Sequence, residues 1–201
     1  MITATDDGSN GYESVANIYI AGRGSRARVG DSVGAGVVKA WASAFPPSAT
    51  VLDLGSGPGE PSTRILQEAG LTPYAVDASP TMVAAFRERF PRVPIEQSTV
   101  EASEFFNRTF RGVLAWGLLF LLDPATQALV IQKVGRVLEP EGRFLFTATR
   151  EPQEWLDGMT DQPSQSLGEE RYKQLLRDAG LKWVADAQDE GENHYYFAEK
   201  V

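Results

Sequence analysis

The residues best suited to bind a ligand form a short glycine-rich stretch after an apolar run. Following Asp53, the chain has a glycine at every second position, at Gly55, Gly57 and Gly59. Glycine tolerates positive φ and lets a ligand approach the backbone closely, so this alternation predicts a tight turn around a ligand. The helix expected next, over residues 60–69, would point its N-terminal NH groups at an anionic group of that ligand.

Two common glycine turns do not fit this spacing. A dinucleotide fingerprint of the form G-x-G-x-x-G that starts at Gly55 needs a third glycine where the chain has Glu60. A phosphate-binding loop needs a lysine followed by serine or threonine after its last glycine, and no lysine lies nearby. A turn that binds nothing accounts for one or two of the glycines, and less often for all three.

A second acidic residue ends the next apolar strand. Asp77 follows a short apolar run and lies 22 residues after Gly55. An acid at the tip of the second strand is placed to accept hydrogen bonds from both ribose hydroxyls of an adenosine. Asp77 and Ser79 also precede Pro80, so we expect them to cap the helix that begins there as well.

Together, these two stretches resemble the first two motifs of class I S-adenosylmethionine-dependent methyltransferases. The family's acid followed by G-x-G-x-G matches residues 53–59, and its second acid matches Asp77. The resemblance covers about residues 50–200 and is closest to the small-molecule, type 11 branch. It implies methyl transfer from S-adenosylmethionine to a small-molecule acceptor, with S-adenosylhomocysteine as the other product.

The resemblance also implies which residues contact the cofactor. They are Tyr19, Arg23, Asp53, Gly55, Ser56, Gly57, Asp77, Ala78, Met82, Thr99, Val100, Ala115 and Trp116. At the end of the third strand, Ser98 and Thr99 stand where the family usually has Gly-Asp, whose acid faces the adenine amino group. Either backbone groups at Thr99 and Val100 replace that carboxylate, or Glu101 reaches over.

The fourth predicted strand, residues 113–117, is followed by a very apolar turn over residues 118–122. The family's fourth motif lies at this strand end, so Ala115 and Trp116 are expected to line the site; a core position is the alternative for Trp116. The Asn-Pro-Pro-Tyr motif of methyltransferases that act on amides of nucleic acids or glutamine is absent. The apolar turn favours an acceptor with an apolar or aromatic portion.

The first 46 residues are expected to form a helical lid. Tyr12, Tyr19 and their apolar neighbours recur at helical spacing over residues 12–20, and a glycine- and arginine-rich loop follows over residues 22–36. The resemblance implies that Tyr19 covers the cofactor and that Arg23 meets its carboxylate. The alternative is a helical flap on the sheet edge, with solvated arginines.

From residue 50 onward, predicted strands and helices alternate with short connections. This order predicts a doubly wound α/β domain with a mostly parallel sheet. The resemblance completes it as the seven-stranded, Rossmann-like sheet of class I methyltransferases, with a terminal antiparallel hairpin. Ligands bind such sheets beyond the carboxyl ends of the strands, where strand order reverses.

The expected elements follow directly from this pattern. The strands are residues 50–54, 73–77, 93–98, 113–117, 143–148, 181–187 and 194–198, and the helices are residues 33–45, 60–69, 80–89, 124–138 and 168–179. We expect one domain over 1–201, made of the lid (1–46), a cofactor-binding core (50–149), an inserted lid segment (150–167) and a C-terminal helix and hairpin (168–201).

Composition argues against several partners. The net charge of −8 opposes non-specific binding to nucleic acid or anionic membrane, although Arg23, Arg26 and Arg28 could form a local basic patch. No apolar run reaches the 18 or so residues that span a bilayer, and the amino end is unlike a signal peptide, so the cytoplasm is the expected location. With one histidine and no cysteine, no metal site is expected.

Methyl transfer from a sulfonium mainly requires that the protein position two reactants and exclude water, and positioning can contribute roughly 7–11 kcal/mol. A base is needed only if the acceptor arrives protonated. His194 is a weak candidate for that base, and a surface histidine in a turn is the favoured alternative. A methyltransferase of protein or RNA, a nicotinamide-dependent oxidoreductase and a non-catalytic cofactor-binding protein are the rival functions; the acceptor and oligomeric state stay open.

Overall fold

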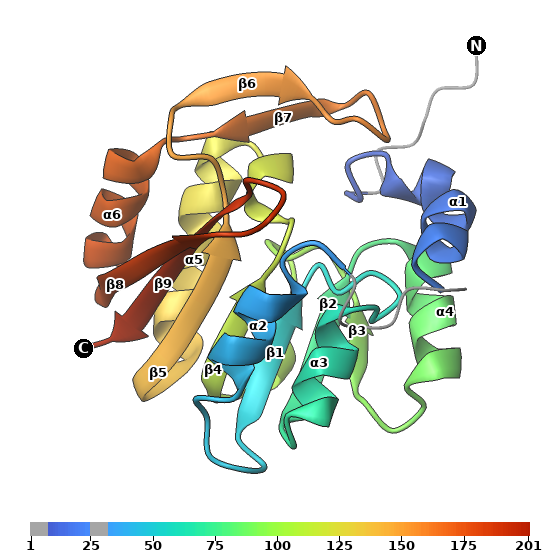
Figure 1. The fold of residues 1–201 in the computed structure, drawn as a ribbon, viewed down its shortest axis with the longest axis horizontal. Helices are drawn as coiled ribbons and strands as arrows, with labels where there is room; N and C mark the ends of the chain where they lie inside the picture. Colours follow the sequence, from blue (N-terminus) through green and yellow to red (C-terminus); the bar gives the residue numbers. More distant parts are fainter. Residues whose placement is uncertain (1–7, 25–31) are drawn as a thin grey trace.

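Seven strands form one sheet in the order β3-β2-β1-β4-β5-β9-β8 (Figure 1). The computed structural model describes residues 8–24 and 32–201. The strands of this sheet are β1 (Thr50–Leu54), β2 (Thr72–Asp77), β3 (Ile95–Gln97), β4 (Phe110–Ala115), β5 (Leu138–Thr147), β8 (Leu181–Gln188) and β9 (His194–Lys200). Strands β1 to β5 pair in parallel, whereas β9 is antiparallel to both β5 and β8. The predicted sheet and its terminal hairpin are confirmed.

Helices cover both faces of this sheet (Figure 1). They are α1 (Tyr12–Gly24), α2 (Ala35–Ala42), α3 (Ser62–Glu68), α4 (Pro80–Arg89), α5 (Pro124–Val137) and α6 (Glu169–Asp178). Val113 and Ala115 of β4 pack in the cluster that includes residues of α5 and α6, while Leu114 between them packs with α2 and α3. Successive side chains of a strand point to opposite faces, so a sheet covered on both sides needs apolar residues at consecutive positions.

The order of the strands reverses at the centre of the sheet. From β1, the chain builds outward to β2 and β3 on one side, and then crosses to β4 and β5 on the other side. Connections that leave β1 and β4 therefore go to opposite faces and leave a crevice at the carboxyl ends of these strands. The sheet thus positions the glycine-rich turn after β1 beside the apolar turn after β4.

Capping residues fix where two of the helices begin. Ser79 Oγ accepts a hydrogen bond from the backbone NH of Met82 at 3.1 Å, and α4 begins at Pro80 as predicted. Asp123 caps α5 in the same way, ahead of Pro124. Proline suits the first helical position because it has no NH to leave unpaired.

Several predicted boundaries were wrong, such as that of the fourth strand, which is Phe110–Ala115 and not 113–117. Three other boundaries also differ. The helix expected from residue 60 begins at Ser62, because Pro61 is the N-cap and the glycine turn continues up to it. The fifth strand begins at Leu138 rather than 143, with an irregular register against β4 where Glu141 has a φ of 60°. Helix α1 runs on to Gly24, so the loop expected from residue 22 begins later.

The segment 150–167 contains a small second sheet. Strands β6 (Gln153–Leu156) and β7 (Pro163–Ser166) pair in antiparallel fashion as a hairpin. The sequence did not predict these strands because they are polar and contain a proline, which disfavours strand structure. Figure 1 shows the hairpin above the carboxyl ends of the central strands, reaching toward the start of α1.

Candidate functional site

A cavity of about 300 Å³ lies at the carboxyl ends of the central strands. Its floor is made by four short segments, which are residues 55–57 after β1, 77–78 at the end of β2, 98–101 after β3 and 116–118 after β4. This is the crevice where strand order reverses, the usual ligand site of such sheets.

The glycine turn after β1 depends on backbone conformations that favour glycine. Gly55, Gly57 and Gly59 have φ values of 65°, 55° and 81°. A Cβ on Gly59 would lie 2.3 Å from the ring of Phe90, so this glycine lets α4 pack closely. A Cβ on Gly57 would instead lie 3.7 Å from the ring of Tyr19. A Cβ would therefore fit at Gly57, which lines the cavity, and it is the positive φ that favours glycine there.

The carboxylate of Asp53 lies beneath this turn and does not line the cavity. Its Oδ2 accepts hydrogen bonds from Ser62 Oγ and Thr63 Oγ1, both at 2.7 Å, and the side chain is buried. Burial raises the pKa of Asp53 to about 6, although the two hydroxyls lower it in part. Asp53 therefore links the glycine turn to the start of α3, and the structure does not bring it to the cavity surface as the sequence predicted.

Asp77 lines the cavity from the tip of β2. Its Oδ2 accepts a hydrogen bond from the NH of Gly57 at 2.7 Å, and its Oδ1 accepts one from the NH of Ser79 at 2.9 Å. The pKa of Asp77 is raised to about 6, mainly because burial disfavours the charged carboxylate. The hydrogen bonds from the backbone NH groups of Ser79 and Gly57 lower this pKa in part, and the negative charge of Glu13 raises it. Each carboxylate oxygen can accept further hydrogen bonds, as two ribose hydroxyls would require.

The loop after β3 is held in place from α5. Lys133 Nζ donates to the carbonyl oxygens of Val100, Glu101 and Ser103 at 3.0, 2.8 and 2.5 Å. Residues 98–101 line the cavity, so both alternatives for this strand end, the backbone at Thr99 and Val100 and the side chain of Glu101, remain open.

An apolar wall follows β4. Trp116 and Leu118 line the cavity together with Phe120, and the ring of Phe120 lies 5.6 Å from that of Trp155 in the hairpin. Trp116 also packs against the buried cluster that includes residues of α2 and α3. It therefore both lines the cavity and contributes to the core, the two alternatives that the sequence offered. Ala115 is fully buried and contributes to the core only, contrary to the prediction that it lines the site.

Helix α1 and the turn of the β6–β7 hairpin both contribute residues to the cavity, and we call these two segments the cap. Figure 1 shows the hairpin reaching toward the start of α1. Tyr12 of α1 donates a hydrogen bond from its hydroxyl to Asp157 Oδ2 at 3.2 Å. Tyr12, Tyr19, Asp157 and Met159 all line the cavity from above its floor. The side chain of Arg23 lies outside the described part of the chain, as do Arg26 and Arg28.

A carboxylate from α1 also contacts the start of α4. Glu13 accepts hydrogen bonds from the hydroxyl of Ser79, from the NH of Thr81 at 3.1 Å and from Thr81 Oγ1 at 2.6 Å. An anion at a helix N-terminus is favourable because unpaired NH groups and the helix dipole face it. This contact fixes α1 beside Asp77.

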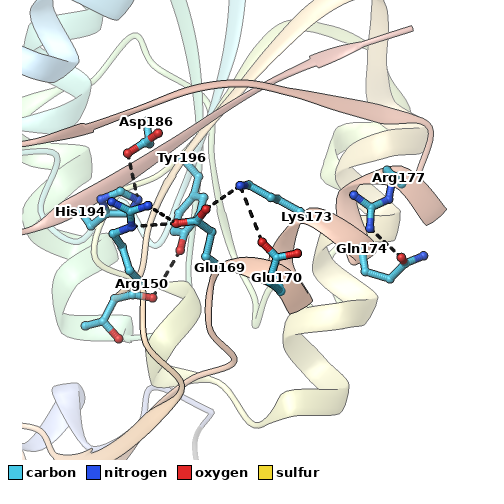
Figure 2. Close-up of polar contacts among 10 residues, drawn as sticks. Arg150, Glu169, Glu170, Lys173, Gln174, Arg177, Asp186, His194 and Tyr196 are labelled. Atoms are coloured by element: carbon cyan, nitrogen blue, oxygen red, sulfur yellow. Dashed lines mark hydrogen bonds and ion pairs between the residues drawn. The ribbon is translucent and has the colours of Figure 1, made fainter.

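His194 lies away from the cavity, in a corner between β8, β9 and α6 (Figure 2). Its Nε2 is 3.7 Å from Asp186 Oδ2, and Arg150 and Glu169 form an ion pair nearby. Burial lowers the pKa of His194, which favours the neutral ring. The weak prediction of a catalytic base at His194 is therefore not supported by its position, and the alternative of a surface turn is also wrong because the side chain is buried.

Most of the predicted cofactor residues meet in the one cavity. Those that line it are Tyr19, Gly55, Ser56, Gly57, Asp77, Ala78, Met82, Thr99, Val100 and Trp116. The sequence reasoning missed Asn10, Asp157 and Met159, which also line it. Their one sequence signal is the neighbouring glycine, Gly11 or Gly158, which marks each position as a turn.

The described ranges contain no cluster of three or more acidic, histidine or cysteine side chains that could hold a metal ion. Within the same ranges, no helix has the length and apolar character needed to cross a bilayer.

Comparison with known proteins agrees with this site. Residues 51–142 match a family model described as a methyltransferase domain. An uncharacterized methyltransferase of Synechocystis sp. is 32% identical over 113 residues, which cover 56% of this chain and 53% of that protein. Another, from Mycobacterium tuberculosis, is 36% identical over 94 residues, covering 47% of this chain and 37% of that protein. The chain thus spans about half, or less, of the length of these relatives.

Solved structures show the same fold. The CcbJ methyltransferase of Streptomyces caelestis aligns with a TM-score of 0.76 at 15% identity, covering 98% of this chain and 100% of that one. Magnesium protoporphyrin IX methyltransferase of Synechocystis, solved with S-adenosylmethionine, aligns with a TM-score of 0.73 at 16% identity over 100% of both chains. Residues 51–142 are thus similar to a methyltransferase domain, and the chain has the fold of solved class I S-adenosylmethionine-dependent methyltransferases.

Proposed function

We propose that this protein transfers a methyl group from S-adenosylmethionine to a small-molecule acceptor and releases S-adenosylhomocysteine. The observation that carries the proposal is the position of Asp77, whose carboxylate lines a cavity directly beside the glycine turn at Gly57. The cavity has polar groups on its floor and an apolar wall at one end, which suits an adenosine and a less polar acceptor.

The described residues fit this cofactor. Asp77 would accept hydrogen bonds from the ribose hydroxyls, and the backbone at Gly55 and Gly57 would lie against the amino-acid portion. Met82 and Val100 offer apolar surface for the base. Asp53 would act through the turn that it holds, and Arg23 remains a prediction from sequence for the cofactor's carboxylate.

When bound, S-adenosylmethionine supplies an electrophilic methyl group on a sulfonium. The contribution of the chain is to orient the acceptor toward that group and to exclude water. Helix α1 and the hairpin serve the second purpose in this proposal, because Tyr12 and Asp157 join them above the cavity. Trp116 and Phe120 would orient the acceptor through apolar and ring contacts. No base is required for an acceptor that arrives with a free lone pair.

A small-molecule acceptor is supported by the acidic charge of the chain and by the small, partly apolar cavity. Among the solved structures with this fold are a 1,6-didemethyltoxoflavin N1-methyltransferase of Burkholderia thailandensis and an amino pentose methyltransferase of Micromonospora echinaspora. Methylation of protein or RNA and cofactor binding without catalysis are the alternatives. The cytoplasmic location stays a prediction from the sequence.

Calorimetric titration with S-adenosylmethionine and S-adenosylhomocysteine tests the proposal first. We expect micromolar binding by the wild type, at least tenfold weaker binding by Asp77→Ala, and no change in Asp178→Ala, an exposed carboxylate at the end of α6. Folded wild-type protein that binds neither compound would overturn the proposal, and nicotinamide cofactors would then be titrated.

Transfer of a labelled methyl group distinguishes the remaining alternatives. Incubation with labelled S-adenosylmethionine and a panel of small apolar and aromatic acceptors should give an extractable labelled product. Label in protein or RNA fractions alone would favour a macromolecular acceptor. Tight cofactor binding without any labelled product would favour a non-catalytic role.

A further inference from the structure

Asn10 presents an unpaired hydrogen-bond donor in the cavity. It lies in the turn before α1, with a φ of 50°, and it lines the cavity. Its Nδ2 is buried, and within residues 8–24 and 32–201 no group accepts a hydrogen bond from it. The other buried side-chain nitrogens and oxygens without a partner in the described ranges belong to residues that do not line the cavity. A buried donor without an acceptor is costly, so a ligand is a natural partner.

The order of the strands indicates how the cofactor would be oriented in the cavity. Asp77 would hold the ribose at the tip of β2, which lies between β3 and β1. The apolar wall at Phe120, Leu121 and Leu122 lies after β4, and this is the end with room for an acceptor. Because the methyl group must face the acceptor, the base must lie on the other side of the ribose, beside residues 98–100 after β3.

The turn that carries Asn10 packs at that same end. A Cβ on Gly8 would lie 2.2 Å from Thr99 Cγ2, so the backbone of Gly8 contacts Thr99 directly. Asn10 is two residues further along and therefore lies within about 7 Å of Gly8. Its carboxamide is thus within reach of a base that lies against Thr99.

Both hydroxyl groups of the β3 loop that lie in the cavity make a hydrogen bond within the loop. Ser98 Oγ donates to the carbonyl oxygen of Thr99 at 3.1 Å, and Thr99 Oγ1 accepts from the NH of Ala102 at 3.4 Å. Besides the backbone at Thr99 and Val100 and the side chain of Glu101, the polar edge of an adenine has a further partner within reach in Asn10.

We propose that the Asn10 carboxamide recognises the adenine edge of the bound cofactor. Its Nδ2 donates to a ring nitrogen and its Oδ1 accepts from the exocyclic amine, the pairing that asparagine makes with adenine in other contexts. Asn10 is then a specificity-determining residue supplied by the segment before α1. This inference rests on the proposed function, because it presumes an adenosine cofactor.

The test compares S-adenosylhomocysteine with S-inosylhomocysteine, in which a carbonyl replaces the exocyclic amine. Calorimetry on the wild type should show at least tenfold tighter binding of the adenine compound. The near-isosteric Asn10→Asp variant lacks the donor but keeps an acceptor for the exocyclic amine, so it should bind S-adenosylhomocysteine about tenfold more weakly and keep its preference over the inosine compound. Asn10→Gly, which also accepts positive φ, has neither group and should show the same loss of affinity together with a smaller preference.

Asn107→Asp is the matched control, because Asn107 has a φ of 49° and lies outside the cavity. Its affinities should equal those of the wild type. Wild-type affinity in both Asn10 variants, or an unchanged preference in Asn10→Gly, would overturn the role of Asn10 and leave the proposed function standing. A wild-type protein that binds neither compound would instead refute the proposed function, and the adenine contact with it.

Discussion

Tyr12 and Asp157 are 145 residues apart, and the hydrogen bond between them closes the cap of the cavity. The hydroxyl of Tyr12 lies 3.2 Å from Asp157 Oδ2. The other oxygen of Asp157 accepts hydrogen bonds from the NH groups of Met159 and Thr160, each at 3.0 Å. One buried carboxylate therefore both shapes the turn of the hairpin and fixes α1 against it.

Tyr12→Phe should loosen this cap. Removal of the hydroxyl leaves one oxygen of a buried carboxylate without its partner, which should weaken S-adenosylhomocysteine binding about three- to tenfold. Amide hydrogen exchange in α1 and the hairpin should become faster, while exchange in β1 and β4 stays unchanged. Tyr74→Phe is the control, since Tyr74 contacts Arg108 outside the cavity. Unchanged affinity and exchange in Tyr12→Phe would contradict a closing role.

The affinity for S-adenosylhomocysteine should depend on pH through Asp77. Its carboxylate must be ionised to accept two ribose hydrogen bonds, and its pKa is raised to about 6. As pH falls below that value, the protonated fraction grows, so affinity should decrease by up to about tenfold per pH unit. Above about pH 7 the affinity should level off. Calorimetry at several pH values measures the profile, and an equally steep profile in Asp77→Asn would assign it to another group.

The sequence predicted the central strands and the position of Asp77 because both depend on local pattern. An apolar run that ends in an acid before a turn defines a parallel strand and its carboxyl end, whatever the rest of the chain does. Asn10 and Asp157 could not be found in this way. Asp157 gains its role through a hydrogen bond with Tyr12, and the turn that carries Asn10 is placed by the packing of Gly8 against Thr99. No periodicity in the sequence records which distant segments meet.

Two of the predicted cofactor residues, Asp53 and Ala115, do not line the cavity, for a common physical reason. Asp53 and Ala115 lie in strands next to the cavity, but alternation along a strand turns their side chains into the protein. His194 could not be placed from the sequence either, because a single histidine beside two tyrosines does not indicate whether its side chain points toward the cavity or away from it. In the structure it contacts Tyr196 edge-on, with ring centroids 4.7 Å apart, and lies away from the cavity.

Asp53 should make the ligand-free protein less stable as pH rises. Its folded pKa of about 6 exceeds the ordinary value of 3.8. Between these values the folded state binds more protons than the unfolded state, so the free energy of unfolding decreases as pH increases. Relative to Asp53→Asn, the wild type should lose on the order of 3 kcal/mol between about pH 4 and pH 7. Urea unfolding measures this difference, and parallel stability curves for the two proteins would contradict it.

Glu13→Gln should weaken cofactor binding and also change its pH dependence. The amide has one acceptor oxygen for the donors of Ser79 and Thr81, so α1 should dock less firmly and affinity at pH 8 should fall about three- to tenfold. The charge of Glu13 raises the pKa of Asp77, so its removal should lower that pKa. The decline of affinity should then begin at a lower pH than in the wild type.

This second effect separates an electrostatic contact from simple loosening of the helix. Loosening alone reduces affinity at every pH and leaves the midpoint of the profile where it was, and that result would refute the charge coupling between Glu13 and Asp77. Glu88→Gln provides the matched control, because Glu88 lies exposed on α4 and outside the cavity. Its affinity and its midpoint should both equal those of the wild type, since an exposed charge on α4 is screened by solvent.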